Sequence, residues 1–302
     1  MTGAIQYAKR RFESARAAIG AETGSETPES TTDLGAAGIH FQLWLLAGLV
    51  LFPILVTVVV STKQQGIVTS LPDLLPGTYA VENYREAIVD YGFGRFMWNS
   101  LLMSVVIVVG KLVVSVLAAM AIVYYRVPYK DLVFLFVLFT LLLPVPVRFV
   151  PLFQLMNDLG WSNSLLAITV PYIASATTVF ILRQHFLSIP TSIVETAKLD
   201  GVGPVKFTLQ VLVPMSRGVL VGVSIIMFVY AWNQYLWPLV IIDSEANQVA
   251  QVGLQLLQGD VQGGQLSWSL VMAGSVLTLL PPLALMILFR KPLLETFAIQ
   301  QK

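Results

Sequence analysis

The chain has 302 residues, of which 56% are hydrophobic and only 12% are charged, and its formal net charge is +1. Soluble domains carry about 25% charged residues, so this composition indicates a membrane protein. The balanced charge offers no basic surface for nucleic acid, and the absence of cysteine excludes disulfides and thiolate metal sites.

Residues 1–39 are much more polar than the rest of the chain. They lack the short apolar core of a secretory signal, so we predict a retained cytoplasmic tail. Its basic residues fit either a surface helix on anionic lipid or an irregular tail that only fixes orientation, and the second interpretation is the simpler one.

The remainder, residues 40–302, contains six apolar runs. A membrane helix needs about 20 apolar residues, and none of the runs alternates as a barrel strand would. We therefore predict an all-α integral membrane protein with six transmembrane helices and short helices within the connecting segment 63–97. The six predicted spans are 40–61, 98–124, 132–153, 164–183, 218–242 and 267–289.

Lysine and arginine set the predicted orientation of these spans. Outside the spans they gather mainly on the side of the N-terminus, which the positive-inside rule assigns to the cytoplasm. We therefore expect a multi-pass protein of the plasma membrane with both termini in the cytoplasm.

The segment at about 188–217 interrupts the apolar pattern with charges, glycines and prolines. Ser192 followed by Glu195 has capping-box spacing and predicts a helix that begins near Ser192. Gly201 suits a left-handed helix end, and Pro204 suits the first turn of a second helix. The pattern predicts a cytoplasmic helix–turn–helix, which either docks a partner or only caps its own bundle.

This segment resembles the EAA motif of permease subunits of importer-type ABC transporters. Glu195-Thr196-Ala197 is followed after three residues by Gly201, and after nine more by Val211-Leu212-Val213-Pro214. Thr196, Val211 and Val213 depart from the strict motif. The resemblance implies a coupling loop whose short helix inserts into a separate ATP-hydrolysing subunit. The residues it assigns to that contact are Glu195, Thr196, Ala197, Asp200, Gly201 and Pro214; we expect Glu195 both to cap its helix and to pair with a cation of the partner.

The same resemblance implies the rest of the assembly. It predicts an ABC-type permease core at about 94–290, two ATPase subunits, a second homologous permease and an extracytoplasmic solute-binding protein, in a prokaryotic plasma (inner) membrane. The chain has no GxxxxGK[ST] run, so ATP and Mg are expected on the ATPase and no cofactor on this chain. We expect a transport subunit, not an enzyme.

Four other stretches point to the cargo. LLPGTY, MWNSLLMS, LLPVPVR and YAWNQYLWPL resemble the permeases of glycerol-3-phosphate importers, within the carbohydrate-uptake (maltose-type) group. The implied function is translocation of glycerol-3-phosphate or a related small polyol or sugar.

Several residues within the spans are candidates for the substrate pathway. Arg148 follows Pro144 and Pro146, which should open the third span. It meets a phosphate, extends to the interface or pairs with a neighbouring subunit. Tyr230, Asn233 and Trp237 have the spacing of one helical face. This face either lines a pathway or forms hydrogen bonds to a companion permease, with Trp237 in the outer aromatic belt. Lys111 lies midway along the second span, where a structural pairing is the expected role.

Two other classes of protein are less compatible with the sequence. A secondary transporter for a sugar or polyol, driven by an ion gradient, would need acidic residues within its spans, and the six predicted spans contain none. A membrane-embedded enzyme would need clustered histidines or carboxylates. We therefore predict no catalytic site and no metal site on this chain.

Overall fold

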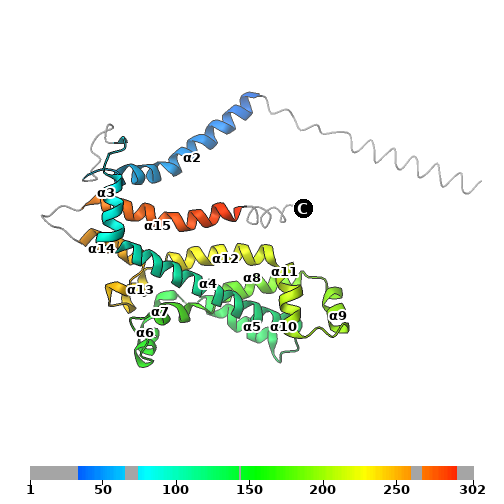
Figure 1. Cartoon of the computed structure of the whole chain (residues 1–302). Coiled ribbons are helices and arrows are strands. Elements are labelled where there is room, and N and C mark those ends of the chain that lie inside the picture. The colour runs from blue at the N-terminus through cyan, green and yellow to red at the C-terminus, as the bar shows by residue number, and fades with distance from the viewer. Residues whose placement is uncertain (1–32, 65–73, 143, 260–266, 291–302) are drawn as a thin grey trace, which may run out of the picture. The chain divides into compact units, whose positions relative to one another are not determined.

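A computed structural model describes residues 33–64, 74–142, 144–259 and 267–290, so the predicted tail lies almost entirely outside the described residues. All regular structure in these ranges is helical (Figure 1). The chain divides into two units, Met1–Leu55 and Val56–Lys302.

From α3 to α14 the helices follow one another with short connections. Those of the first half are α2 (Asp33–Ser61), α3 (Ala80–Arg85), η2 (Glu86–Asp90), α4 (Phe93–Tyr124), α5 (Lys130–Phe139), η3 (Thr140–Leu142), η4 (Val145–Arg148) and α6 (Phe149–Asp158). Those of the middle are α7 (Leu165–Thr169), η5 (Val170–Tyr172), α8 (Ala176–Leu187), α9 (Thr191–Leu199), α10 (Pro204–Phe207), η6 (Thr208–Leu212) and α11 (Val213–Met215). The last are α12 (Arg217–Trp232), α13 (Leu236–Ile241), η7 (Glu245–Asn247), α14 (Ala250–Gly259) and α15 (Trp268–Leu288).

Four stretches among the described residues are long and apolar enough to cross a membrane. They are Gly38–Ser61, Phe93–Tyr124, Leu165–Leu187 and Trp268–Leu288, and they match the predicted first, second, fourth and sixth spans. Counting the pair Pro204–Met215 and Arg217–Trp232, which is bent by 82°, as one span gives five. These stretches confirm an all-helical chain with several spans, and the count of six remains a prediction.

The predicted third span, 132–153, is not one helix. Helix α5 passes into the 3-10 turn η3, which ends at Leu142, and η4 follows, with the Val147 N–H bonded to the Pro144 carbonyl at 3.1 Å. Pro144 and Pro146 have no N–H to donate and their rings clash with the preceding turn, which disfavours a continuous helix here, and the chain restarts as α6.

The predicted fifth span, 218–242, is also broken. Helix α12 ends at Trp232 with Asn233 as its C-cap, and α13 begins at Leu236. Pro238 could not donate to the carbonyl of Gln234 within a continuous helix, but it is tolerated in the first turn of a new one.

Helix α4 is the centre of the second unit. It packs against α8 and α12 along much of its length and against α7 and α14 nearer its beginning (Figure 1). Its packed face includes small and medium side chains such as Ser100, Ser104, Ile107 and Ala119, which are all fully buried. This arrangement fixes the positions of the polar and charged residues described below.

Candidate coupling element and intramembrane cluster

Residues 191–215 form the element α9–α10–η6–α11, at one end of the helices α4, α8 and α12 (Figure 1). Gly201 ends α9 with φ +67°. Its N–H bonds the Lys198 carbonyl at 3.1 Å, and the Val202 N–H bonds the Ala197 carbonyl at 3.0 Å. This pair of bonds is a Schellman motif, which requires the left-handed conformation that glycine adopts without strain. The predicted helix end at Gly201 is therefore confirmed.

The second helix also starts as predicted. Gly203 is the N-cap of α10 and Pro204 its first residue, where the missing N–H has no cost. Helix α10 continues through the π-turn η6 into α11, which contains Pro214. The result is a tight turn between two helical segments.

The predicted capping box is wrong. Helix α9 begins at Thr191 with Pro190 as its N-cap and no side-chain cap hydrogen bond. Because the N-cap lies two residues before Ser192, Glu195 falls in the second turn of α9 and cannot reach the first free N–H groups. Glu195 is exposed, and no ion pair is found for it among the described residues.

The side chains assigned to the partner contact divide into two sets. Glu195, Thr196, Asp200, Gly201 and Pro214 are exposed. Ala197 is 8% exposed and packs into the chain's own core. The Ala197 side chain is therefore accessible to a partner only inside a groove.

That groove opens between α9 and η6. It has a volume of about 360 Å³. Its walls combine apolar side chains with the carboxylate of Asp200 and two hydroxyl residues, and the full lining is Ser192, Ile193, Thr196, Ala197, Asp200, Val202 and Val211. The element thus presents the exposed side chains of Glu195, Lys198 and Asp200 beside a shallow, mostly apolar groove.

The inner face of the element is joined to the ends of α4 and α8. Val194, Ala197, Phe207 and Leu212 share one apolar cluster with residues of those helices, including Met120. The Thr208 hydroxyl lies 2.9 Å from the Met120 sulfur. The element is therefore packed directly onto the ends of α4 and α8.

Lys111, on α4, is buried with 4% exposure. Its ammonium lies 3.7 Å from the sulfur of Met227 and 4.6 Å from the centroid of the Tyr230 ring, both on α12. The expected structural pairing is thus a thioether and an aromatic face, with no carboxylate partner among the described residues.

Arg148 lies exposed at the break between η4 and α6 and is the N-cap of α6. It interacts electrostatically with Tyr172 of η5, which in turn interacts with Tyr230. Tyr172 is half-buried against the core cluster around Trp237. Arg148, Tyr172, Tyr230 and Lys111 are therefore linked in series by electrostatic interactions and one cation–ring contact, and together with Met227 they form the Lys111 cluster.

The prediction that Tyr230, Asn233 and Trp237 share a helical face is wrong, because α12 ends between them. Asn233 is exposed and accepts a hydrogen bond from Gln251 Nε2 at 3.1 Å. Trp237 is fully buried, and its indole N–H donates to the Ala167 carbonyl at 2.9 Å. Trp237 therefore belongs to the protein core and not to an outer aromatic belt.

Sequence reasoning missed Tyr172 and Met227. Met227 lies three residues before Tyr230, so helical spacing places both on the face that meets Lys111. Tyr172 had no such signal, because its position follows from the 3-10 turn at Val170–Tyr172. Within the described ranges no group of three or more histidine, cysteine or acidic residues could hold a metal ion.

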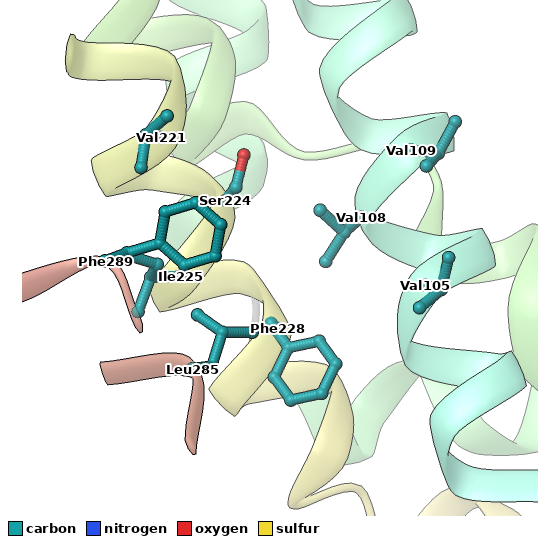
Figure 2. Close-up of a pocket in the computed structure, with 9 residues that line it drawn as sticks. All are labelled: Val105, Val108, Val109, Val221, Ser224, Ile225, Phe228, Leu285 and Phe289. Atoms are coloured by element: carbon teal, nitrogen blue, oxygen red, sulfur yellow. The ribbon is translucent and has the colours of Figure 1, made fainter. Parts of the chain in front are cut away.

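A cavity of about 220 Å³ lies between α4, α12 and α15 (Figure 2). Its lining is aliphatic and aromatic apart from Ser224, whose hydroxyl donates to the Leu220 carbonyl of its own helix at 2.6 Å. The lining residues are Val105, Val108, Val109, Val221, Ser224, Ile225, Phe228, Leu285 and Phe289. This cavity offers no recognition group for a polar or charged solute, in contrast to the cluster around Lys111.

These features are those of a membrane transport subunit, and comparisons with known proteins agree. Residues 111–291 match the family model "Binding-protein-dependent transport system inner membrane component". The chain therefore belongs to this family of inner-membrane transport components.

Particular relatives narrow the class. The chain is 37% identical over 269 residues to the sn-glycerol-3-phosphate transport system permease protein UgpE of Brucella melitensis, covering 85% of this chain and 95% of the relative. It is 37% identical over 265 residues to the protein of that name from Pectobacterium atrosepticum, covering 84% and 93%.

A solved structure shares the fold. A chain in the crystal structure of a bacterial ABC transporter involved in the import of the acidic polysaccharide alginate matches with a TM-score of 0.77 and 21% identity. The match covers 88% of this chain and 99% of that one.

Proposed function

We propose that this chain is the permease subunit of an ATP-binding-cassette importer that carries glycerol-3-phosphate, or a related small polyol or sugar, across the prokaryotic plasma membrane. The observation that carries the proposal is its 37% identity, over 85% of the chain, to glycerol-3-phosphate permeases. Enzymatic turnover is not part of this role.

Energy enters through α9. The exposed Glu195 and Asp200 and the adjoining groove form a surface for a separate ATPase subunit that binds ATP and Mg. Carboxylates on this surface suit pairing with a cation of the partner. Closure of the ATPase would displace α9, and the packed cluster beneath it would carry the movement into α4 and α8.

The pathway lies between two permeases. We propose a second, homologous permease beside this chain, two ATPase subunits because each permease presents one α9, and a solute-binding protein that delivers cargo at the outer face. Both termini lie in the cytoplasm in this topology.

The membrane domain has six spans in this proposal, two of which are the broken segments at Pro144 and Asn233. Irregular backbone at membrane depth is tolerated only where protein buries it or where it lines a water-filled cavity. The exposed Arg148 and Asn233, which border these breaks, are therefore proposed to face the pathway together with Tyr230.

A secondary transporter driven by an ion gradient is the alternative. It would use carboxylates within the spans as ion or proton relays. The five apolar stretches of the described chain contain no Asp or Glu, which leaves such a mechanism without a carboxylate relay there.

The proposal is tested by mild-detergent purification of the tagged chain from its native host, with mass spectrometry of the retained proteins. An ATPase subunit and a second permease should copurify, and the ATPase should be lost when Glu195→Ala and Gly201→Val are combined. A chain purified alone that transports without ATP would establish the alternative.

A further inference from the structure

Among the residues that the structure describes, none places a counter-charge beside Lys111. Its ammonium contacts a thioether and an aromatic ring, and the described residues supply no carboxylate within 4.0 Å. Burying an ionised amine is strongly unfavourable unless an opposite charge compensates it, and such groups inside membrane segments commonly mark ligand or ion pathways. The arrangement therefore suits a lysine that meets a visiting anion.

The depth of Lys111 agrees with this role. Lys111 lies thirteen residues before the end of α4 at Tyr124, and Tyr230 lies thirteen residues after the start of α12 at Arg217. At 1.5 Å per residue both are about 20 Å from the end that carries the α9 element, well inside a hydrocarbon core about 30 Å thick. Substrate sites of transporters commonly lie at this depth.

The surroundings of Lys111 lead towards an exposed surface. Tyr230 covers the ammonium and is itself 44% exposed. Gly110 allows Ile173 to pack directly against α4, because a Cβ at Gly110 would lie 2.7 Å from Ile173 Cγ1. Tyr172, which precedes Ile173 in the chain, interacts electrostatically with both Tyr230 and the exposed Arg148. Two cations and two phenol groups from four elements are thus linked by contacts or by electrostatic interactions.

We propose that Lys111 is the cation that recognises the phosphate group of the cargo inside the membrane. When no anion is bound, the Tyr230 ring stays in contact with the Lys111 ammonium. A charge-assisted hydrogen bond to phosphate is stronger than an ammonium–ring contact, so an arriving phosphate displaces the ring. The ring then restores the resting state when cargo leaves. This inference rests on the proposed function, because it assigns the anion selectivity of that pathway.

The test uses the complete transporter in lipid nanodiscs without its solute-binding protein, and equilibrium dialysis against radiolabelled glycerol-3-phosphate and against glycerol. Lys111→Gln should weaken glycerol-3-phosphate binding by about 10- to 100-fold, as expected for loss of one charge-assisted bond. Lys111→Arg should stay within about threefold of wild type, since it keeps the charge. Glycerol binding should be equally weak in all three proteins.

Arg183 provides a matched control. It is another cation within an apolar stretch, and its guanidinium lies 4.0 Å from the centroid of the Phe134 ring, away from the Lys111 cluster. Arg183→Gln should leave glycerol-3-phosphate binding within about twofold of wild type.

The outcomes separate this inference from the proposed function. Wild-type binding by the Lys111→Gln complex, or no binding by a wild-type transporter that does take up glycerol-3-phosphate, would overturn the role of Lys111 and leave the importer intact. Loss of the companion permease from the Lys111→Gln complex, restored by Lys111→Arg, would overturn it in favour of a carboxylate on that permease. A wild-type transporter that takes up only neutral solutes would refute the proposed cargo itself.

Discussion

The rings of Tyr124 and Phe207 meet edge to face with their centroids 5.6 Å apart. Tyr124 is the last residue of α4 and Phe207 the last of α10, and the Tyr124 hydroxyl also donates to the Phe186 carbonyl of α8 at 2.8 Å. One residue therefore links the exposed α9–α10 element to the ends of two long helices. The same helix, α4, carries Lys111, so α9 and the Lys111 cluster are connected through a single rigid element.

Gly201→Val tests the turn that ends α9. Nothing lies within 4 Å of a Cβ added at Gly201, so the substitution acts through the φ of +67° and not through a clash. A left-handed residue with a side chain costs about 1–2 kcal/mol, more when it is β-branched, so the turn should rearrange. We expect the complex to reach the membrane normally but to lose ATP-driven uptake, measured beside its ATPase activity.

Gly203→Ala is the matched control for this change. Gly203 also has open space around it, but its φ of −68° suits any residue. Uptake should stay near the wild-type value. Normal uptake by Gly201→Val would contradict the assignment of this turn to coupling.

Glu195→Gln tests the exposed carboxylate of α9. Since Glu195 neither caps its helix nor has an ion-pair partner among the described residues, its removal should leave the thermal stability of the isolated permease unchanged. Affinity for the ATPase subunit should fall by about 1–3 kcal/mol if the carboxylate pairs with a cation there. Copurification and binding titrations measure this. The exposed Glu245 of η7 is the control, and an equal loss from Glu245→Gln would show that only net charge matters.

Trp237→Phe tests the placement of Trp237 in the protein core. The change keeps an aromatic ring in a fully buried position but leaves the Ala167 carbonyl without its donor. The expected loss is about 1–3 kcal/mol of unfolding free energy, visible as a lower Tm of the purified protein. Trp98→Phe, at a tryptophan that is 62% exposed, should hardly change the Tm. A Trp237→Phe variant that loses transport at an unchanged Tm would instead show that Trp237 acts in the substrate pathway.

Gly110→Ala tests the close contact between α4 and the turn at Ile173. The new Cβ would lie 2.7 to 3.0 Å from three atoms of the Ile173 side chain, so the turn must move. Overpacking of this kind costs about 1–3 kcal/mol. Adding Ile173→Ala should recover part of the lost Tm, because it clears the space. A strictly additive double mutant would show that the two residues do not meet.

The long uninterrupted helices and the turn after α9 could be predicted from local sequence pattern. Continuous apolar runs predicted α4 and α15, and the glycine–proline pattern predicted the turn after α9, because backbone preferences alone decide such positions. The breaks were harder to place. Pro144 indicated the first break, whereas the break after Trp232 depends on Pro238, six residues later. Helix α9 begins directly after Pro190, so its N-cap lies before the residues of the predicted capping box.

The Lys111 cluster could not be predicted from the sequence. Lys111 and Tyr230 were each conspicuous as polar groups in apolar runs, but no periodicity relates residues on different helices. The contact between Lys111 and Tyr230 depends on how α4 packs against α12. The position of Tyr172 depends on a 3-10 turn in a third segment. Burial of Trp237 was equally a tertiary outcome, since its spacing along the chain suited a different face.

The most direct test of the whole account is uptake of radiolabelled glycerol-3-phosphate by the complete transporter reconstituted in liposomes, with ATP supplied on the side of α9. We predict uptake that requires ATP and the solute-binding protein and persists when ion gradients are dissipated. Uptake without ATP that collapses with the ion gradient, or ATP-driven uptake of neutral sugars alone, would contradict it.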